Sequence, residues 1–404
     1  MVFNFFLPQI NLFFGRGALE NIGEEAKKLG RSALLVTGKS SMARLGFLDE
    51  TIDYLQKAGI DVTHFDKVIP NPTTELVDEG AKLALENDCN LVVALGGGSS
   101  IDVAKTIAVV VGHSTEEFHS IWEFSPSHDS PKAITSKTLP IIAVTSTSGT
   151  GSHLSRFSVI TNPWLKEKVG IPSEYIFPKV SIVDVNILKG MPPALTAECG
   201  VDVLTHCLEG LISKQSNPMS EELALKGIEL VFDHLPKAYR DGDNLKSREG
   251  MALADTYAGL VITTSRVTLT HALSHPISAY YPDISHGAAL AALTPAGMEF
   301  NIAGGDENTL QKFCLAAGAM GKKVYGTSEE EAMKSVEGVR ELLSKIDMDM
   351  SLMDLGVEPK RIREIVNSAF KSCKGPLLAN PVEVNERDLT RVLKASVQQK
   401  ISKR

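Results

Sequence analysis

The chain has 404 residues, of which 43% are hydrophobic and 22% charged, and its formal net charge is −8. This length exceeds what one compact core usually holds and indicates two domains. The acidic balance leaves no basic surplus for phosphate backbones or anionic lipid, so neither a nucleic-acid nor a membrane partner is expected. No apolar stretch of the sequence is long enough to span a bilayer.

The first fourteen residues are apolar, but they are interrupted by Asn4, Pro8, Gln9 and Asn11 and no basic residue precedes them. This pattern argues against a secretory signal. The five cysteines are scattered and form no C-x-x-C pair, so neither a disulfide framework nor a thiolate zinc site is indicated. We therefore expect a reducing, cytoplasmic setting.

The first half of the chain alternates β-branched runs with amphipathic segments. Strands are predicted at residues 33–37, 61–65, 91–95, 139–144 and 180–183, and helices at 48–58, 75–86 and 101–111. Such alternation predicts β-α-β units and a mainly parallel sheet. Residues 125–137 are mostly polar and contain two prolines, which indicates a surface loop within this domain.

After Met191-Pro192-Pro193 the pattern changes, because from Leu195 onward apolar residues recur at helical spacing and β-branched runs largely disappear. Pro193, followed by Thr196 and Glu198, is a plausible helix start. We therefore predict an α/β dinucleotide-binding domain with a Rossmann-like parallel sheet at residues 1–190, and an all-α metal-binding domain at residues 191–404.

A glycine-rich loop follows the strand predicted at 91–95. Gly96, Gly97 and Gly98 allow close backbone approach, and the N-terminus of the next helix favours an anion such as a pyrophosphate, although a tight β-α turn could need the same glycines. A second loop, residues 145–152, also follows a strand and offers hydroxyls and amides. Two such loops indicate a dinucleotide. The expected cofactor-binding residues here are Gly97, Gly98, Ser99, Asp102, Thr145, Ser146 and Ser148, with Asn71 and Lys168.

The choice between NAD and NADP usually depends on the end of an early strand, where a carboxylate would bind a free ribose 2′-hydroxyl and repel a 2′-phosphate. Here the strand at 33–37 is followed by Gly38-Lys39-Ser40-Ser41, with no carboxylate. We expect Gly38, Ser40 and Ser41 to lie at this position and NADP(H) to be favoured over NAD(H). The alternative is an ordinary loop with no such role.

The helical half contains a possible metal constellation. Asp202 and His206 lie four residues apart, His271 and His275 repeat that spacing, and His286 follows; residues four apart share a helix face. One histidine on a helix is more often part of the core, but two such pairs favour a metal site. One carboxylate with three imidazoles suits Fe²⁺ or Zn²⁺, whereas Mg²⁺ or Ca²⁺ prefers more oxygen. The predicted ligands are Asp202, His206, His271 and His286.

At this point the sequence resembles the iron-containing (group III) alcohol dehydrogenase family over nearly its whole length. The resemblance is carried by Pro8 and residues 14–18, by the loops at 96–105 and 145–152, and by Asp202-x-x-x-His206, His271-x-x-x-His275-Pro276 and His286-Gly287. It implies the fold of that family and of dehydroquinate synthase, with catalysis in a cleft between the two domains. It also implies the same four ligands.

The resemblance places His275 near nicotinamide and substrate without making it a required ligand. We therefore expect a proton-relay role for His275 and name Asp202, His206 and His275 as catalytic residues. Pro276 is predicted to end or kink the helix that carries His275. The sequence also departs from the family. His153 stands where many relatives carry Glu, Gly38 stands where many NAD-using relatives carry Asp, and one extra residue separates His271 from His286.

The parts together predict an NAD(P)-dependent alcohol dehydrogenase or aldehyde reductase acting on a short-chain substrate, with Fe²⁺ favoured and Zn²⁺ as the alternative metal. We expect a homo-oligomer, a dimer or larger. One alternative is a glycerol dehydrogenase or dehydroquinate synthase of similar fold, which the fourth candidate ligand disfavours. Another is a non-catalytic nucleotide-binding protein whose metal is structural, which would have a closed metal site.

Overall fold

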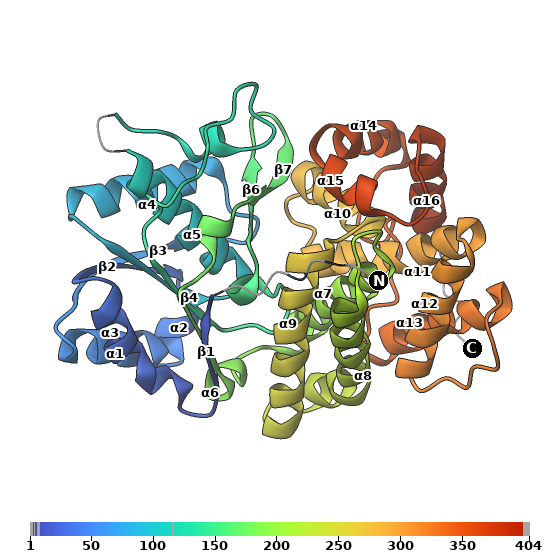
Figure 1. Cartoon of the computed structure of the whole chain (residues 1–404), viewed down its shortest axis with the longest axis horizontal. Helices are drawn as coiled ribbons and strands as arrows, with labels where there is room; N and C mark the ends of the chain where they lie inside the picture. Colours follow the sequence, from blue (N-terminus) through green and yellow to red (C-terminus); the bar gives the residue numbers. More distant parts are fainter. Residues whose placement is uncertain (1–2, 4, 6–8, 115–116, 399–404) are drawn as a thin grey trace. The chain divides into compact units, whose positions relative to one another are not determined.

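The computed structural model describes residues 3, 5, 9–114 and 117–398. The chain divides into two compact units, Leu7–Met191 and Pro192–Arg404, and the described residues Phe3 and Phe5 group with the second (Figure 1). Part of the apolar start of the chain, on which the prediction about a secretory signal rested, lies outside the described residues. Within the described ranges, no helix combines the length and hydropathy that crossing a membrane requires.

The first unit is built on a parallel sheet of six strands in the order β1-β8-β5-β4-β2-β3. All five predicted strands are confirmed. The strands are β1 (Asn11–Gly15), β2 (Ser32–Gly38), β3 (Asp61–Val68), β4 (Leu91–Gly96), β5 (Ile141–Thr145) and β8 (Val180–Asp184). Strand β1 was not predicted, because its only pairing is with β8, far away in the sequence.

Helices cover both faces of this sheet, as Figure 1 shows. On β4, Val92 and Ala94 pack with α4 and α5, whereas Val93 and Leu95 face the opposite core with α1 and α3. This alternation produces three layers, because successive side chains of a strand point to opposite faces. The predicted helices are confirmed. The helices of this unit are α1 (Ile22–Leu29), α2 (Ser41–Arg44), α3 (Phe47–Lys57), α4 (Thr74–Glu86), α5 (Gly98–His113) and α6 (Val185–Leu188).

A separate antiparallel hairpin of β6 (Phe157–Asn162) and β7 (Glu167–Pro172) follows the second glycine-rich loop. It packs against α5, and Thr161 bridges to Thr73 at the start of α4. The predicted surface loop at 125–137 contains neither helix nor strand. Among the described residues of this unit, the hairpin adds to the predicted β-α-β plan, as do β1 and the short helices α1, α2 and α6.

In the second unit the described residues 192–398 form helices joined by loops and contain no strand. The predicted helix start at Pro193 is confirmed. Its helices are α7 (Pro193–Ile212), α8 (Pro218–Arg240), α9 (Leu245–Ser265), α10 (Leu269–Tyr280), α11 (His286–Gly304), α12 (Glu307–Ala319), α13 (Glu329–Lys345), α14 (Ile362–Ser372), α15 (Lys374–Ala379) and α16 (Glu386–Gln398). Helix α7 is buried along most of its length and packs against α8, α9 and α11.

Pro276 was predicted to end or kink its helix. It does not end the helix, since α10 continues to Tyr280, and a kink stays a prediction. A proline inside a helix removes one N–H and crowds the preceding turn. In α10 the residues from Leu269 to Ser278 are all buried, and the helix packs on α11, α14 and α15. This tertiary burial outweighs the local cost of the proline.

Candidate functional site

Helix α7 places three polar side chains along one buried face. Asp202, His206 and Glu209 are four and seven residues apart, so they lie on successive turns of the same side. Each is at most 5% exposed. Ionic and polar groups this deep need partners, and those partners come from α10 and α11.

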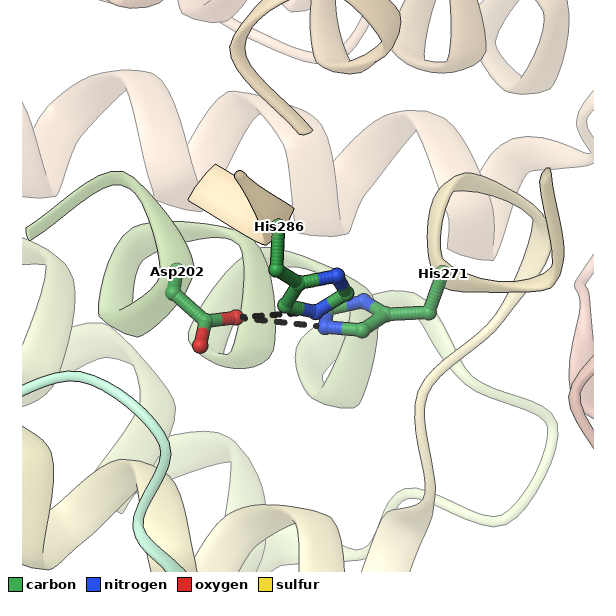
Figure 2. A group of neighbouring side chains, drawn as sticks. All are labelled: Asp202, His271 and His286. Atoms are coloured by element: carbon green, nitrogen blue, oxygen red, sulfur yellow. Dashed lines mark hydrogen bonds and ion pairs between the residues drawn. The ribbon is translucent and has the colours of Figure 1, made fainter. Parts of the chain in front are cut away.

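His271 lies on helix α10, and His286 is the first residue of helix α11. Three imidazole Nε2 atoms approach Oδ1 of Asp202: His271 at 3.4 Å, His206 at 3.5 Å and His286 at 3.7 Å. Figure 2 shows the rings of His271 and His286 turned toward this carboxylate. The ligand atoms of Asp202, His271 and His286 all lie within 4.8 Å of one another. The ring of His206 stacks on that of His271, with centroids 4.6 Å apart.

The close approach of α11 to α7 depends on Gly287. A Cβ at this position would lie 2.4 Å from the carbonyl oxygen of Glu198 and 2.7 Å from its Cα. Such distances are far inside van der Waals contact, so only glycine lets the two helices meet here. Because Glu198 lies one turn before Asp202, this contact brings His286 to the same face of α7. Ser285 caps α11 by accepting a hydrogen bond from the Ala288 N–H at 3.2 Å.

His271 is held between two carboxylates. Its Nδ1 lies 2.6 Å from Oε2 of Glu209, on the side of the ring opposite Asp202. Burial by itself would lower the pKa of His271, but Glu209 and Asp202 outweigh it and raise the pKa to about 9. The pKa of Glu209 is lowered by His271 against the effect of burial. Two buried carboxylates thus require positive charge at this site.

Three of these side chains, Asp202, His271 and His286, form a group whose ligand atoms could hold a divalent cation. His206 approaches Asp202 to 3.5 Å but lies outside that group. Ligand atoms held about 2.0–2.2 Å from a metal in a tetrahedron lie about 3.3–3.6 Å from one another, and the three nitrogen–oxygen distances to Asp202 are 3.4–3.7 Å. The His271 ring, bonded through Nδ1 to a carboxylate, has the arrangement typical of metal-ligating histidines. The side chain of His286 is 24% exposed, so the cluster is not sealed from solvent as a structural site would be.

His275 lies beside this cluster and outside the group of mutually close ligand atoms. Its ring centroid is 5.6 Å from that of His286 and 6.3 Å from that of His271. It is 8% exposed, and its Nδ1 lies 4.0 Å from Sγ of Cys373. The structure therefore places His275 next to the candidate metal centre.

The predicted nucleotide-binding residues gather at the carboxyl ends of three neighbouring strands. Thr37 pairs with Leu95, and Gly96 with Thr145, so the loops after β2, β4 and β5 lie at one edge of the sheet. From β2 the chain adds β3 on one side, and from β4 it adds β5 on the other side, so the strand order switches direction between β2 and β4. Ligands of open α/β sheets usually bind at such a switch point.

The two glycine-rich loops pack directly on each other. A Cβ on Gly98 would lie 2.4 Å from Cγ2 of Thr150, and one on Gly97 would lie 3.0 Å from Cγ2 of Thr147. The Ser146 N–H donates to the Gly96 carbonyl at 2.9 Å. Gly98 and Ser99 form the first turn of α5, while Thr145, Ser146 and Ser148 are buried in the second loop.

Asp102 uses both carboxylate oxygens within this unit. Oδ1 accepts a hydrogen bond from Ser152 Oγ at 2.6 Å, and Oδ2 accepts one from the Val159 N–H at 3.0 Å. The residue thereby ties α5 to the second glycine-rich loop and to β6. The geometry gives Asp102 a role in shaping the loops, in addition to any contact with a cofactor.

Lys105 is fully buried one turn further along α5. Its Nζ donates to Ser152 Oγ at 3.0 Å and to the carbonyls of Ser155 and Phe157 at 2.9 and 2.7 Å. Burial lowers the pKa of Lys105 to about 8, with Asp102 opposing the shift. His153, also buried, has its pKa lowered to about 3 by burial and by Lys105. At neutral pH the His153 ring is therefore uncharged.

The remaining predicted residues lie around these loops. Lys168 on β7 donates from Nζ to Asn71 Oδ1 at 2.8 Å, so these two contact each other. Ser40 and Ser41 are exposed at the start of α2. Gly38 ends β2, and a Cβ there would meet only the Val68 carbonyl oxygen, at 3.7 Å. A larger residue at position 38 therefore has room.

Glu209 is the side chain at this site that the sequence analysis missed. The signal was present, because a carboxylate seven residues after Asp202 and three after His206 must share their helix face. Its hydrogen-bond partner His271 is 62 residues away in the sequence, so only the structure shows this contact.

Two family models match the chain: iron-containing alcohol dehydrogenase over residues 8–185, and the C-terminal domain of the Fe-containing alcohol dehydrogenase family over residues 196–397. A crystal structure of an archaeal halo-thermophilic alcohol dehydrogenase from a Red Sea brine pool superposes with a TM-score of 0.96 at 51% identity, covering 98% of this chain and 99% of that one. The chain is 34% identical to the 1,3-propanediol dehydrogenase of Citrobacter freundii, over 97% of this chain and 98% of the relative.

The chain is also 31% identical to the NADPH-dependent butanol dehydrogenase of Clostridium saccharobutylicum, over 96% of each chain. These full-length matches agree with the α/β unit, the helical unit and the carboxylate–imidazole cluster described above. The chain therefore belongs to the iron-containing alcohol dehydrogenase family and is a metal-dependent oxidoreductase that interconverts alcohols and aldehydes with NAD(P).

Proposed function

We propose that Asp202, His206, His271 and His286 hold one divalent metal ion, and that the protein reduces short-chain aldehydes or oxidises the matching alcohols. One observation carries the proposal: three imidazole Nε2 atoms surround one carboxylate oxygen at distances typical of neighbouring metal ligands. We favour Fe²⁺, the metal for which the family is named, with Zn²⁺ as the alternative because N/O ligand sets bind both.

When bound, the metal would supply Lewis acidity toward the substrate oxygen and the nicotinamide would supply or accept the hydride. The protein's part is positioning. Asp202 contributes the one negative charge among the four ligands, and Glu209 orients the His271 ring. The partly exposed His286 marks the side of the cluster that solvent reaches.

We propose that His275 moves a proton for the reaction. Its ring lies within 6.3 Å of two proposed ligands without belonging to their group, and imidazole exchanges protons near neutral pH. His275→Ala should lower kcat and change its pH dependence while leaving the metal content as in the wild type. Unchanged turnover and pH dependence would remove this role.

We further propose that the loops after β2, β4 and β5 bind the dinucleotide, with NADP(H) preferred. Gly97, Gly98 and Ser99 would face the pyrophosphate at the start of α5, and the residues Thr145, Ser146, Ser148, Asn71, Asp102 and Lys168 line or shape the adjoining loops. Gly38, Ser40 and Ser41 would face the ribose 2′ position. The preference rests on the absence of a carboxylate after β2.

Two relatives support a short substrate, because they are named for 1,3-propanediol and for butanol. The test uses metal-stripped protein with a panel of short aldehydes and either NADPH or NADH, before and after anaerobic addition of Fe²⁺ or Zn²⁺. We expect metal-restored turnover that is faster with NADPH. Turnover that survives metal removal would contradict the proposed metal role, and faster turnover with NADH would contradict the reading of Gly38.

A further inference from the structure

The buried carboxylate of Glu209 accepts four hydrogen bonds. Oε2 accepts from His271 Nδ1 at 2.6 Å and from the Thr268 N–H at 3.0 Å. Oε1 accepts from the Thr270 N–H at 2.5 Å and from Thr268 Oγ1 at 2.9 Å. The side chain is 3% exposed, so four donors satisfy a carboxylate that water hardly reaches.

Three of these bonds hold the backbone that carries His271. The N–H groups of Thr268 and Thr270 flank the first residue of α10, and His271 is the third residue of that helix. Thr268, the N-cap residue, makes no side-chain capping bond of its own. A carboxylate at this end of a helix satisfies free N–H groups and is favoured by the helix dipole.

The fourth bond acts on the imidazole ring itself. Nε2 of the ring lies 3.4 Å from Asp202 Oδ1. When a cation displaces the proton from Nε2, a carboxylate at Nδ1 keeps the remaining ring proton on Nδ1 and leaves the Nε2 lone pair for that cation. It also fixes the plane of the ring. Without this acceptor the proton could move to Nε2, and that nitrogen could no longer bind a cation.

We propose that Glu209 is a positioning residue for the metal centre, which sets both the tautomer of His271 and the location of the helix that carries it. The inference rests on the proposed ligand set, because it requires His271 to bind the metal through Nε2. Glu209 itself lies behind the ring, on the side away from Asp202, and acts only through His271.

Glu209→Gln tests the tautomer with almost no change of shape. The amide oxygen can still accept from Thr268 Oγ1 and the Thr270 N–H. The NH₂ group then faces the Thr268 N–H and His271 Nδ1, both of which are donors to Glu209. Backbone N–H groups cannot reverse their polarity, whereas His271 can: its Nδ1 would accept from the NH₂ group and its proton would sit on Nε2. Thr268→Val is the matched control, because it removes one hydrogen bond to Glu209 and leaves the His271 contact intact.

The experiment titrates metal-free full-length protein with Co²⁺ against a chelator and records the visible ligand-field spectrum and the apo-protein melting temperature. We expect Glu209→Gln to raise the Co²⁺ dissociation constant by about 10- to 100-fold and to alter the spectrum. Thr268→Val should lower the melting temperature and leave both metal readouts at wild-type values. Wild-type Co²⁺ affinity and spectrum in Glu209→Gln would overturn the proposal, as would equal metal losses in both variants.

His271→Ala separates this inference from the ligand assignment. If His271→Ala binds Co²⁺ as tightly as the wild type, the proposed ligand set is wrong. If His271→Ala weakens binding and Glu209→Gln does not, only the positioning role fails. Should Glu209→Gln give no cooperative melting transition, Glu209→Asp replaces it: the shorter carboxylate stays charged but withdraws from Nδ1, so a weaker Co²⁺ complex is expected and an unchanged one refutes the role.

Discussion

Replacing Gly287 with alanine would push the start of α11 away from α7. The added methyl would lie 2.4 Å from the Glu198 carbonyl oxygen, where ordinary contact begins at 3.4 Å. The obstacle is backbone, which cannot rotate aside, so the helices must separate by about 1 Å. His286 is the residue before Gly287 and Asp202 lies one turn after Glu198, so the displacement acts directly on the proposed ligands.

The expected consequence follows from the ligand geometry. A 1 Å displacement would lengthen the distance from His286 Nε2 to Asp202 Oδ1 from 3.7 Å to about 4.7 Å. Two atoms bonded to one cation at about 2.0–2.2 Å cannot be more than about 4.4 Å apart. Gly287→Ala should therefore detach His286 and weaken metal binding by about 100-fold or more, and overpacking should cost about 1–3 kcal/mol of stability.

Chelator competition with Zn²⁺ or Co²⁺ measures the affinity, and thermal melting of the metal-free protein measures the stability. Gly304→Ala is the control, because it makes the same change at the other end of α11, where the new Cβ meets a Val382 side-chain methyl at 3.0 Å. Alanine is favoured over glycine within helices by about 1 kcal/mol, so backbone propensity cannot explain a loss. Wild-type metal affinity in Gly287→Ala would refute the argument.

Three further predictions concern the cofactor, a buried cation and the metal. Gly38→Asp should lower the ratio of kcat/KM with NADPH to kcat/KM with NADH by about tenfold or more, because the carboxylate would repel the 2′-phosphate. Gly38→Asn, a side chain of equal size, should preserve the ratio. An equal change of kcat/KM with both cofactors in Gly38→Asp would mean that Gly38 does not lie near the 2′ position. Lys105, with its pKa lowered from 10.5 to about 8, holds its proton less tightly when folded, so the unfolded chain binds more protons between these pH values and stability should rise with pH there. In urea unfolding, the free energy of unfolding of the wild type should rise from pH 8 to 10.5 by on the order of 3 kcal/mol relative to that of Lys105→Met. The same pH dependence in both proteins would show that Lys105 is not the cause. Zn²⁺ returned to stripped protein at about 100 times its dissociation constant should add about 2.7 kcal/mol to the free energy of unfolding; an unchanged transition would mean that no metal binds the folded state preferentially.

Local patterns were enough to predict the architecture, because they depend on one element at a time. Alternating β-branched runs and amphipathic segments indicated the strands β2, β3, β4, β5 and β8, and helical spacing indicated the second unit. The i, i+4 spacing placed Asp202 with His206, since a helix face is set by the 3.6-residue period. The glycine-rich loops were located because each follows a strand directly.

Tertiary structure decided what depends on two distant segments meeting. Strand β1 is a strand only through β8, and α10 continues through Pro276 because neighbouring helices bury it. Asp202 faces three imidazoles because Gly287 lets α11 touch α7, and Glu209 bonds to His271 because α10 begins beside it. Spacing along the chain determines which side chains share a face, whereas the packing of other elements against that face determines what those side chains contact.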